Sequence, residues 1–240
     1  MSLKLIRRKL LKILELLEKP RLLFRELVKI TRYRHRFVNR RVWIEWQQYD
    51  FTTQGKDIAS RALKSRRFQV VKRIVRELGD GLRILDVGCG DGAIAQYFLE
   101  NRNYVLGLDL PKVAKLAAKY SGIQVIAGDA ESLPLRPKSF DLLLALELIE
   151  HLWDPMSFLK EASRVLNQQG YMIISTPEGR KSLMYDTHKH FFTEWKLRAL
   201  VEDAGFILVK VMRVKEKGAP TNTLIILLPV SYTHLTLPTT

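Results

Sequence analysis

Glycines and acidic residues cluster in the segment Ile84-Leu-Asp-Val-Gly-Cys-Gly-Asp-Gly-Ala93. Three glycines at alternate positions allow the backbone to approach a bound ligand closely, where side chains would collide. The segment also fits the G-x-G-x-x-A spacing of nicotinamide-binding folds through Gly88, Gly90 and Ala93. However, carboxylates accompany it, because Asp86 precedes the glycines and Asp109, Asp129 and Glu147 follow later apolar segments. Such carboxylates would repel a dinucleotide pyrophosphate and attract a ligand with an ammonium, a sulfonium and a ribose diol.

A second group of residues could carry out a reaction beside that ligand. Glu147-Leu-Ile-Glu150-His151 contains two carboxylates and an imidazole, and His188 and His190 lie further along the chain. One interpretation is a divalent metal such as Mg²⁺ held by Glu147, Glu150, His151 and His188, which would lower the pKa of a bound hydroxyl. In the other, His151, His188 or His190 acts as a simple catalytic base, or Glu150 and His151 only brace the following helix.

Short apolar segments of strand character alternate with helical segments after residue 80. The expected strands are 82–87, 104–108, 123–127, 140–146 and 171–175, and the expected helices are 93–100, 113–120, 155–166 and 194–204. Two last apolar segments, 206–214 and 223–228, have no helix between them and predict an antiparallel pair at one edge. We therefore predict an α/β fold, a doubly wound Rossmann-like sheet of seven strands, mostly parallel with the last strand antiparallel. Ligands bind such sheets at the carboxyl ends of the strands, where the acidic residues lie.

These motifs, in this order, resemble the class I S-adenosylmethionine-dependent methyltransferases, and especially the type 11 and quinone-biosynthesis O-methyltransferases. The resemblance covers about residues 80–228 and rests on five segments: Leu85–Gly92, Gly107–Leu110, Gly128–Pro134, Phe140–Glu147 and Arg164–Pro177. It implies that S-adenosylmethionine is the cofactor. By this resemblance, Asp86 and its neighbours Gly88, Cys89 and Gly90 lie along the cofactor. Asp109 and the adjacent Leu110 bind its ribose, Asp129 and Ala130 flank the adenine, and Leu146 lies near the sulfonium.

The Glu-x-x-Glu-His pattern with a later histidine is similar to two methyltransferase branches, the quinone-biosynthesis enzymes and those that methylate the terminal 2′-hydroxyl of small RNAs. We therefore expect methyl transfer to a hydroxyl oxygen of a small or lipid-linked molecule. The alternatives are a metal-dependent RNA 2′-O-methyltransferase and a non-catalytic protein that keeps the fold for binding. Because the cofactor turn needs a small residue at this position, Cys89 is expected to be a packing residue rather than a reactive thiol.

The charge of the 240-residue chain is uneven. Residues 1–80 hold 22 basic and 8 acidic side chains, whereas the remaining residues hold 18 and 17. We predict a basic helical N-terminal extension at 1–80, including helices at 3–17 and 56–78, followed by the methyltransferase domain at 81–229. An amphipathic helix within residues 1–19 favours peripheral contact with an anionic membrane, on its inner face. Nucleic-acid binding by the arginine- and tryptophan-containing segment 32–46, and a lid over the site, are the alternatives.

The chain has no apolar stretch long enough to cross a membrane, and the single cysteine gives no sign of an oxidising compartment. We therefore expect a cytoplasmic protein. Residues 230–240 resemble the translation of a transposon-derived sequencing adapter, so we expect a non-native tail there.

Overall fold

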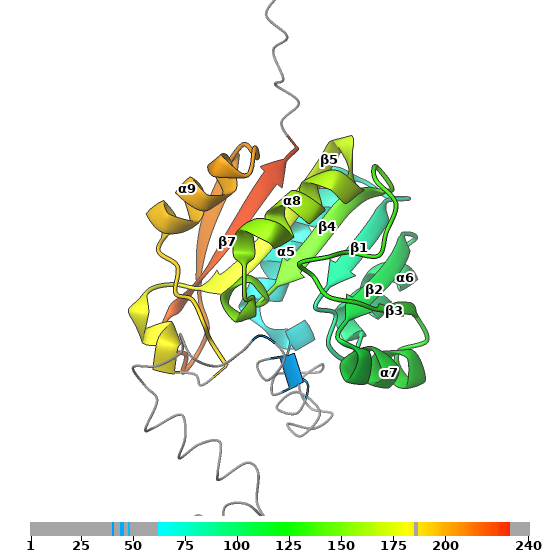
Figure 1. Cartoon of the computed structure of the whole chain (residues 1–240), viewed down its shortest axis with the longest axis horizontal. Helices are drawn as coiled ribbons and strands as arrows, with labels where there is room; N and C mark the ends of the chain where they lie inside the picture. The colour runs from blue at the N-terminus through cyan, green and yellow to red at the C-terminus, as the bar shows by residue number, and fades with distance from the viewer. Residues whose placement is uncertain (1–39, 41–43, 46–47, 49–61, 185–186, 231–240) are drawn as a thin grey trace, which may run out of the picture. The chain divides into compact units, whose positions relative to one another are not determined.

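A seven-stranded sheet forms the centre of the fold (Figure 1). The computed structural model describes Arg40, residues 44–45, Gln48, residues 62–184 and residues 187–230. The strands are β1 (Arg83–Val87), β2 (Tyr104–Asp109), β3 (Gln124–Ala127), β4 (Phe140–Leu146), β5 (Leu166–Pro177), β6 (Lys210–Lys215) and β7 (Asn222–Pro229). Their order is β3-β2-β1-β4-β5-β7-β6, and β7 runs antiparallel to both of its neighbours. The predicted doubly wound α/β sheet, with its last strand antiparallel, is confirmed.

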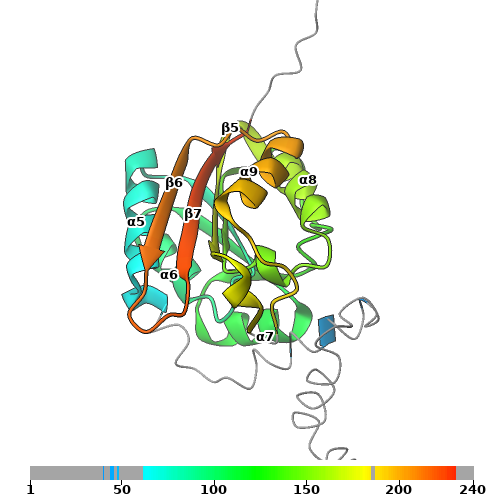
Figure 2. The same ribbon diagram turned by 90° about the vertical axis from the view of Figure 1, so that its left-hand side faces the viewer.

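Helices cover both faces of this sheet. They are α5 (Arg66–Leu78), α6 (Ala93–Glu100), α7 (Pro111–Tyr120), α8 (Pro155–Val165) and α9 (Glu194–Asp203), with short 3₁₀ turns η1 (Ile149–His151) and η2 (Arg180–Met184). Figure 2 shows α5 and α6 on one side of the sheet and α8 and α9 on the other. Side chains alternate between the two resulting cores, since Leu142 and Leu144 of β4 face α5 and α6, whereas Leu143 and Ala145 face α8 and α9. This burial on both faces explains why the central strands are almost continuously apolar.

Helix α5 lies inside the expected N-terminal extension, yet it packs on the sheet. Phe68, Val71, Ile74 and Val75 are buried in one of the two cores. By its contacts the chain forms two units, 1–43 and 44–240. The helix expected at 56–78 is therefore present over the range of α5, and residues 56–61 lie outside the described part.

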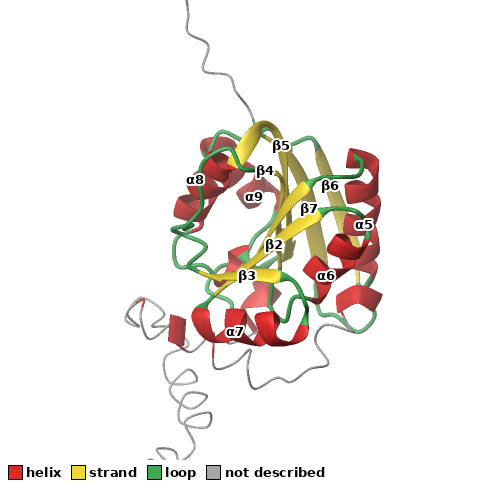
Figure 3. Cartoon of the chain, turned by 90° about the vertical axis from the view of Figure 1, so that its right-hand side faces the viewer, coloured by secondary structure: helices red, strands yellow, loops and turns green. Residues whose placement is uncertain are grey.

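The strand order reverses between β1 and β4, which are parallel neighbours. From β1 the chain builds outward through β2 to β3, and from β4 it builds through β5 to the antiparallel pair. Figure 3 shows the sheet from the β3 side, with one helical layer on each face. The glycine turn follows β1 and Glu147 follows β4, so both motifs meet at the switch point where such folds bind ligands.

Several expectations fall on residues that the structure does not describe. These are the amphipathic helix at 3–17, the membrane contact through 1–19 and the tail at 230–240 except its first residue. Val230 is described, and its backbone N–H donates to the Gly170 carbonyl at 3.0 Å. Within the described ranges, no helix has both the length and the apolar character that crossing a membrane requires.

Candidate functional site

A cavity of about 410 Å³ opens at the carboxyl ends of β1 and β4. This volume lies in the range of small-molecule binding sites. The cavity brings together most of the residues singled out from the sequence: Gly88, Cys89, Gly90, Asp109, Leu110, Leu146, Glu147, His151 and His188.

The glycine turn after β1 is held in a shape that larger residues resist. Gly88 has φ +74°, and a Cβ at this position would lie 2.9 Å from Cδ1 of Leu148. Gly90, also with positive φ, donates its N–H to Oδ2 of Asp109 at 2.8 Å. The bare backbone therefore forms part of the cavity wall, next to a carboxylate.

Asp109 ends β2 and is fixed by two hydrogen bonds. Its Oδ1 accepts from the N–H of Leu110 at 2.7 Å, in addition to the bond from Gly90. Burial raises the pKa of Asp109 to about 6, although the two N–H donors oppose this shift. A carboxylate held in this way can accept hydrogen bonds from a ligand diol without having to reorganise.

Asp86 is the second buried carboxylate near the turn. Burial, and then the charges of Asp109 and Asp91, raise its pKa to about 7. Its Oδ2 is buried and has no hydrogen-bond partner among the described residues. A buried acceptor with no partner is costly, so a donor-bearing cation at this end of the site would stabilise it.

The predicted adenine-flanking pair does not line the cavity. Oδ1 of Asp129 accepts from the N–H of Glu131 at 2.9 Å, and Ala130 is buried in the core on the α8 side. Their roles stay predictions. Cys89 does line the cavity, but burial raises the pKa of its thiol and its Sγ packs close to Gly107.

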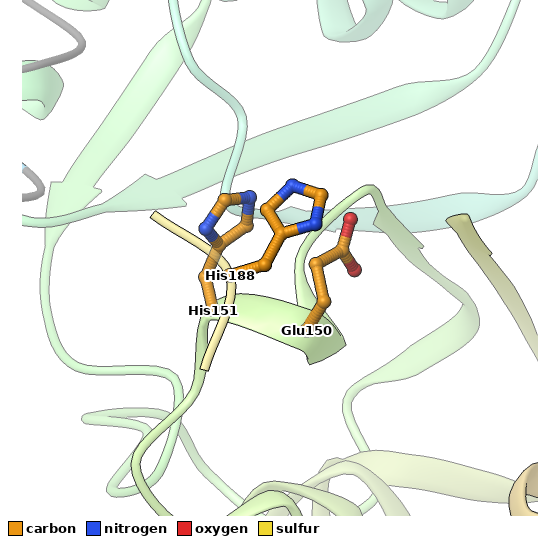
Figure 4. A group of neighbouring side chains, drawn as sticks. All are labelled: Glu150, His151 and His188. Carbon is orange, nitrogen blue, oxygen red and sulfur yellow. The ribbon is translucent and has the colours of Figure 1, made fainter. Parts of the chain in front are cut away.

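Glu150, His151 and His188 form a compact cluster of possible metal ligands. One donor atom from each lies within 4.8 Å of the other two. In Figure 4, the first two side chains rise from η1, and the His188 ring lies between them. The structure thus brings together three of the four predicted ligands.

Hydrogen bonds orient this cluster. Nδ1 of His151 donates to the carbonyl of Thr187 at 2.7 Å, which leaves the lone pair on Nε2. Thr176 Oγ1 donates to Oε2 of Glu150 at 2.9 Å. The other oxygen, Oε1, is buried and has no partner among the described residues. An imidazole braced by a carbonyl and an unpartnered carboxylate oxygen suit a divalent cation.

Burial also controls the charges in this cluster. It lowers the pKa of His151 to about 4, and together with His151 it lowers that of His188 to about 3. Burial and the neighbouring Glu147 raise the pKa of Glu150 well above its ordinary value. The two imidazoles are therefore neutral near pH 7, the form that can coordinate a metal.

Two predicted residues are not part of this cluster. His190 does not line the cavity, and its Nε2 donates to the Leu152 carbonyl at 3.0 Å. Glu147 lines the cavity, but its Oε2 accepts from Nη1 of Arg67 at 3.0 Å and its Oε1 accepts from Ser175 Oγ at 2.9 Å. Glu147 also has φ +55°, an uncommon conformation for a residue other than glycine.

The structure adds cavity residues for which no role was predicted from the sequence. Arg67 reaches the cavity from α5, and Ser175 reaches it from β5. Gln48 also lines it, and its Oε1 accepts from the N–H of Lys112 at 2.9 Å. Arg67 and Gln48 lie far along the chain from the motifs that they meet, so spacing alone could not identify them.

Comparisons with known proteins agree with this site. Residues 85–174 match a family described as a methyltransferase domain. A probable S-adenosylmethionine-dependent methyltransferase of Mycolicibacterium smegmatis is 33% identical over 149 residues, which are 59% of this chain and 58% of that protein. The ubiquinone biosynthesis O-methyltransferase of Leptothrix cholodnii is 35% identical over 106 residues, 40% of this chain and 45% of its own. The chain thus spans only about half the length of these relatives.

A solved structure shows the same fold. The 1,6-didemethyltoxoflavin-N1-methyltransferase of Burkholderia thailandensis, with bound S-adenosylhomocysteine, has a TM-score of 0.67 and 22% identity, covering 81% of this chain and 92% of its own. The strand order, the glycine turn and the sequence match agree with one another. Residues 85–174 therefore match a methyltransferase domain, and the described sheet has the fold of this solved structure.

Proposed function

We propose that this protein transfers the methyl group of S-adenosylmethionine to a hydroxyl oxygen of a small or lipid-linked molecule. The observation that carries this proposal is that one cavity holds two kinds of group side by side. Gly88, Gly90 and Asp109 form a cofactor-type wall, and His151 and His188 lie in the same cavity. The acceptor would then meet the methyl group beside the imidazoles.

The cofactor side follows from the shape and charge of the turn. Asp109 would accept hydrogen bonds from the ribose, and the unpartnered Oδ2 of buried Asp86 would face the positively charged methionine end. In the reaction, the acceptor oxygen bonds to the methyl carbon while the carbon–sulfur bond breaks. S-adenosylhomocysteine leaves with the electron pair of the broken bond, and the hydroxyl proton passes to solvent water. The chain's task is to hold the two reactants in line.

Hydroxyl methylation also explains the cluster beside the cavity. Glu150, His151 and His188 would hold a divalent metal, which when bound lowers the pKa of an acceptor hydroxyl. Two imidazoles with one carboxylate suit a first-row transition metal better than Mg²⁺, which prefers oxygen ligands. The printed name of the Leptothrix relative, an O-methyltransferase, supports an oxygen acceptor. A lipid-linked acceptor agrees with the membrane contact proposed for residues 1–19.

The test is to incubate the purified protein with methyl-labelled S-adenosylmethionine and a cell extract, then separate lipid, RNA, protein and small molecules. We expect label in the lipid or small-molecule fraction, and loss of labelling with Asp109→Ala. Asp80→Ala is the matched control, because Asp80 is an exposed carboxylate away from this cavity.

Three outcomes would contradict parts of this proposal. If the wild-type protein labels no more strongly than Asp109→Ala, this would argue against catalysis. If the label is confined to the RNA fraction, the acceptor would be RNA and not a small or lipid-linked molecule. Full activity in excess chelator, with no metal in the purified protein, would remove the metal while leaving methyl transfer intact.

A further inference from the structure

Glu147 is the predicted metal ligand that the structure leaves out of the cluster. Both of its carboxylate oxygens are engaged, Oε2 by Arg67 at 3.0 Å and Oε1 by Ser175 at 2.9 Å. The cluster of ligand atoms within 4.8 Å consists of Glu150, His151 and His188. Glu147 is therefore held outside the cluster, although it lies only three residues before Glu150 in the sequence.

The backbone at Arg67 is held in place independently of Glu147. It lies in the first turn of α5, next to buried Phe68, and its backbone N–H donates to Oε1 of Glu216 at 2.8 Å. Both members of the ion pair are partly shielded, with 34% of the Arg67 side chain and 25% of the Glu147 side chain exposed. The helix thus fixes the backbone position from which the guanidinium reaches Glu147.

Arg67 also places a positive charge next to the cluster in which a metal cation would bind. Among the described residues that line the cavity, it is the one with a permanent positive charge. Its guanidinium would repel a cation in the neighbouring cluster and at the same time occupies a carboxylate that could bind this cation. The repulsion weakens cation binding as a whole, and the occupied carboxylate acts against a fourth protein ligand.

We propose that Arg67 is a positioning residue that binds Glu147 and so keeps the metal site at three protein ligands, Glu150, His151 and His188. This inference rests on the metal site of the proposed function. Catalytic metal sites commonly keep a coordination position open for water or substrate, whereas sites closed by four protein ligands are structural. Arg67 therefore preserves the open position at which an acceptor hydroxyl would bind.

The experiment measures Co²⁺ binding to the purified, metal-free protein at pH 8 by visible absorption, which reports both affinity and coordination. Arg67→Met keeps the aliphatic stem and removes the charge, so Glu147 is released. We expect Co²⁺ to bind about tenfold more tightly, the scale on which residues behind metal ligands act, with an altered absorption spectrum. Arg67→Lys restores a cation and should return both values to those of the wild type.

Two further variants separate this role from charge alone. Arg67→Met/Glu147→Gln removes one charge of each sign, so its affinity and spectrum should match the wild type. Arg66→Met removes a neighbouring charge whose exposed guanidinium contacts the Lys215 carbonyl at 3.4 Å, and it should leave Co²⁺ binding unchanged.

The results distinguish the inference from the metal site itself. If Co²⁺ binds to the wild type and is lost in Glu150→Gln, but Arg67→Met binds no more tightly, the inference is wrong and the metal site stands. A gain that persists in the double variant also overturns it, since Glu147 would not be involved. If neither the wild type nor Arg67→Met binds Co²⁺, the metal site and the inference both fail, while cofactor binding is judged separately.

Discussion

Removing the Asp109 side chain tests the cofactor site most directly. The carboxylate accepts backbone N–H groups at 2.7 and 2.8 Å and would accept the two ribose hydroxyls of the cofactor. Hydrogen bonds to a charged group contribute about 1.5–3 kcal/mol each, so losing two would cost about 3–6 kcal/mol. Asp109→Ala should therefore weaken binding by about 100-fold or more. Asp109→Asn keeps one acceptor oxygen and should lose about 10- to 100-fold.

The assay is isothermal titration calorimetry with S-adenosylhomocysteine, which carries the same ribose and is not consumed. Thermal unfolding is measured in parallel, because the Ala variant also leaves the Gly90 and Leu110 N–H groups without their acceptor. Asp80→Ala serves as the matched control. An unchanged affinity in a folded Asp109→Ala protein would refute the assignment of Asp109 to the ribose.

The raised pKa of Asp109 predicts that both stability and cofactor binding depend on pH. Because burial raises this pKa from 3.8 to about 6, the folded state holds the proton more strongly than the unfolded state. The contribution of this group to stability is thus present below pH 4 and is lost as the pH rises through about 6. Cofactor binding should change in the opposite sense, weakening from pH 8 to pH 5 in the wild type and much less in Asp109→Asn.

Two further predictions concern the imidazoles and helix α5. NMR titration should show His151 and His188 neutral down to about pH 5, since burial lowers their pKa to about 4 and about 3. Histidines of the urea-unfolded chain should titrate near their ordinary pKa of 6.5. Titration of both residues near 6.5 in the folded protein would contradict the buried cluster. Phe68→Ala should lower the free energy of unfolding by about 3–5 kcal/mol in urea denaturation, because it opens a cavity under α5. Trp195→Ala, at a side chain 77% exposed, is its control, and equal effects would mean that α5 does not pack as described.

The fold could be predicted from local pattern because its signals are local. Residues 140–146 and 93–100 were predicted within the bounds of β4 and α6, since an apolar strand on both faces or an amphipathic helix is visible in a short window. The extent of β5 was underestimated. It begins at Leu166, where pairing with Phe140 extends the strand beyond the apolar segment, and that pairing depends on a partner elsewhere in the chain.

The candidate site, like the fold, could be predicted only where local pattern or fold class determines the position of a residue. Gly88, Gly90 and Asp109 line one cavity, as expected, because the fold class fixes where strands end. The cluster of possible ligands differs in part from the predicted set, since the position of Glu150 rather than Glu147 in it depends on where each carboxylate finds a partner. That partner, Arg67, lies 80 residues before Glu147, and no spacing rule connects them.

A local signal for Arg67 was nevertheless present in α5. With 3.6 residues per turn, positions 67, 71, 74 and 78 lie along one side of the helix, and at positions 71 and 74 that side is buried against the sheet. Arg66, Arg73 and Arg76 lie on the opposite, exposed side. An arginine that begins an apolar stripe is costly to place there unless a carboxylate meets it. Among the arginines of α5, three therefore face solvent and Arg67 is turned toward the site, and helical phase separates them where net charge cannot.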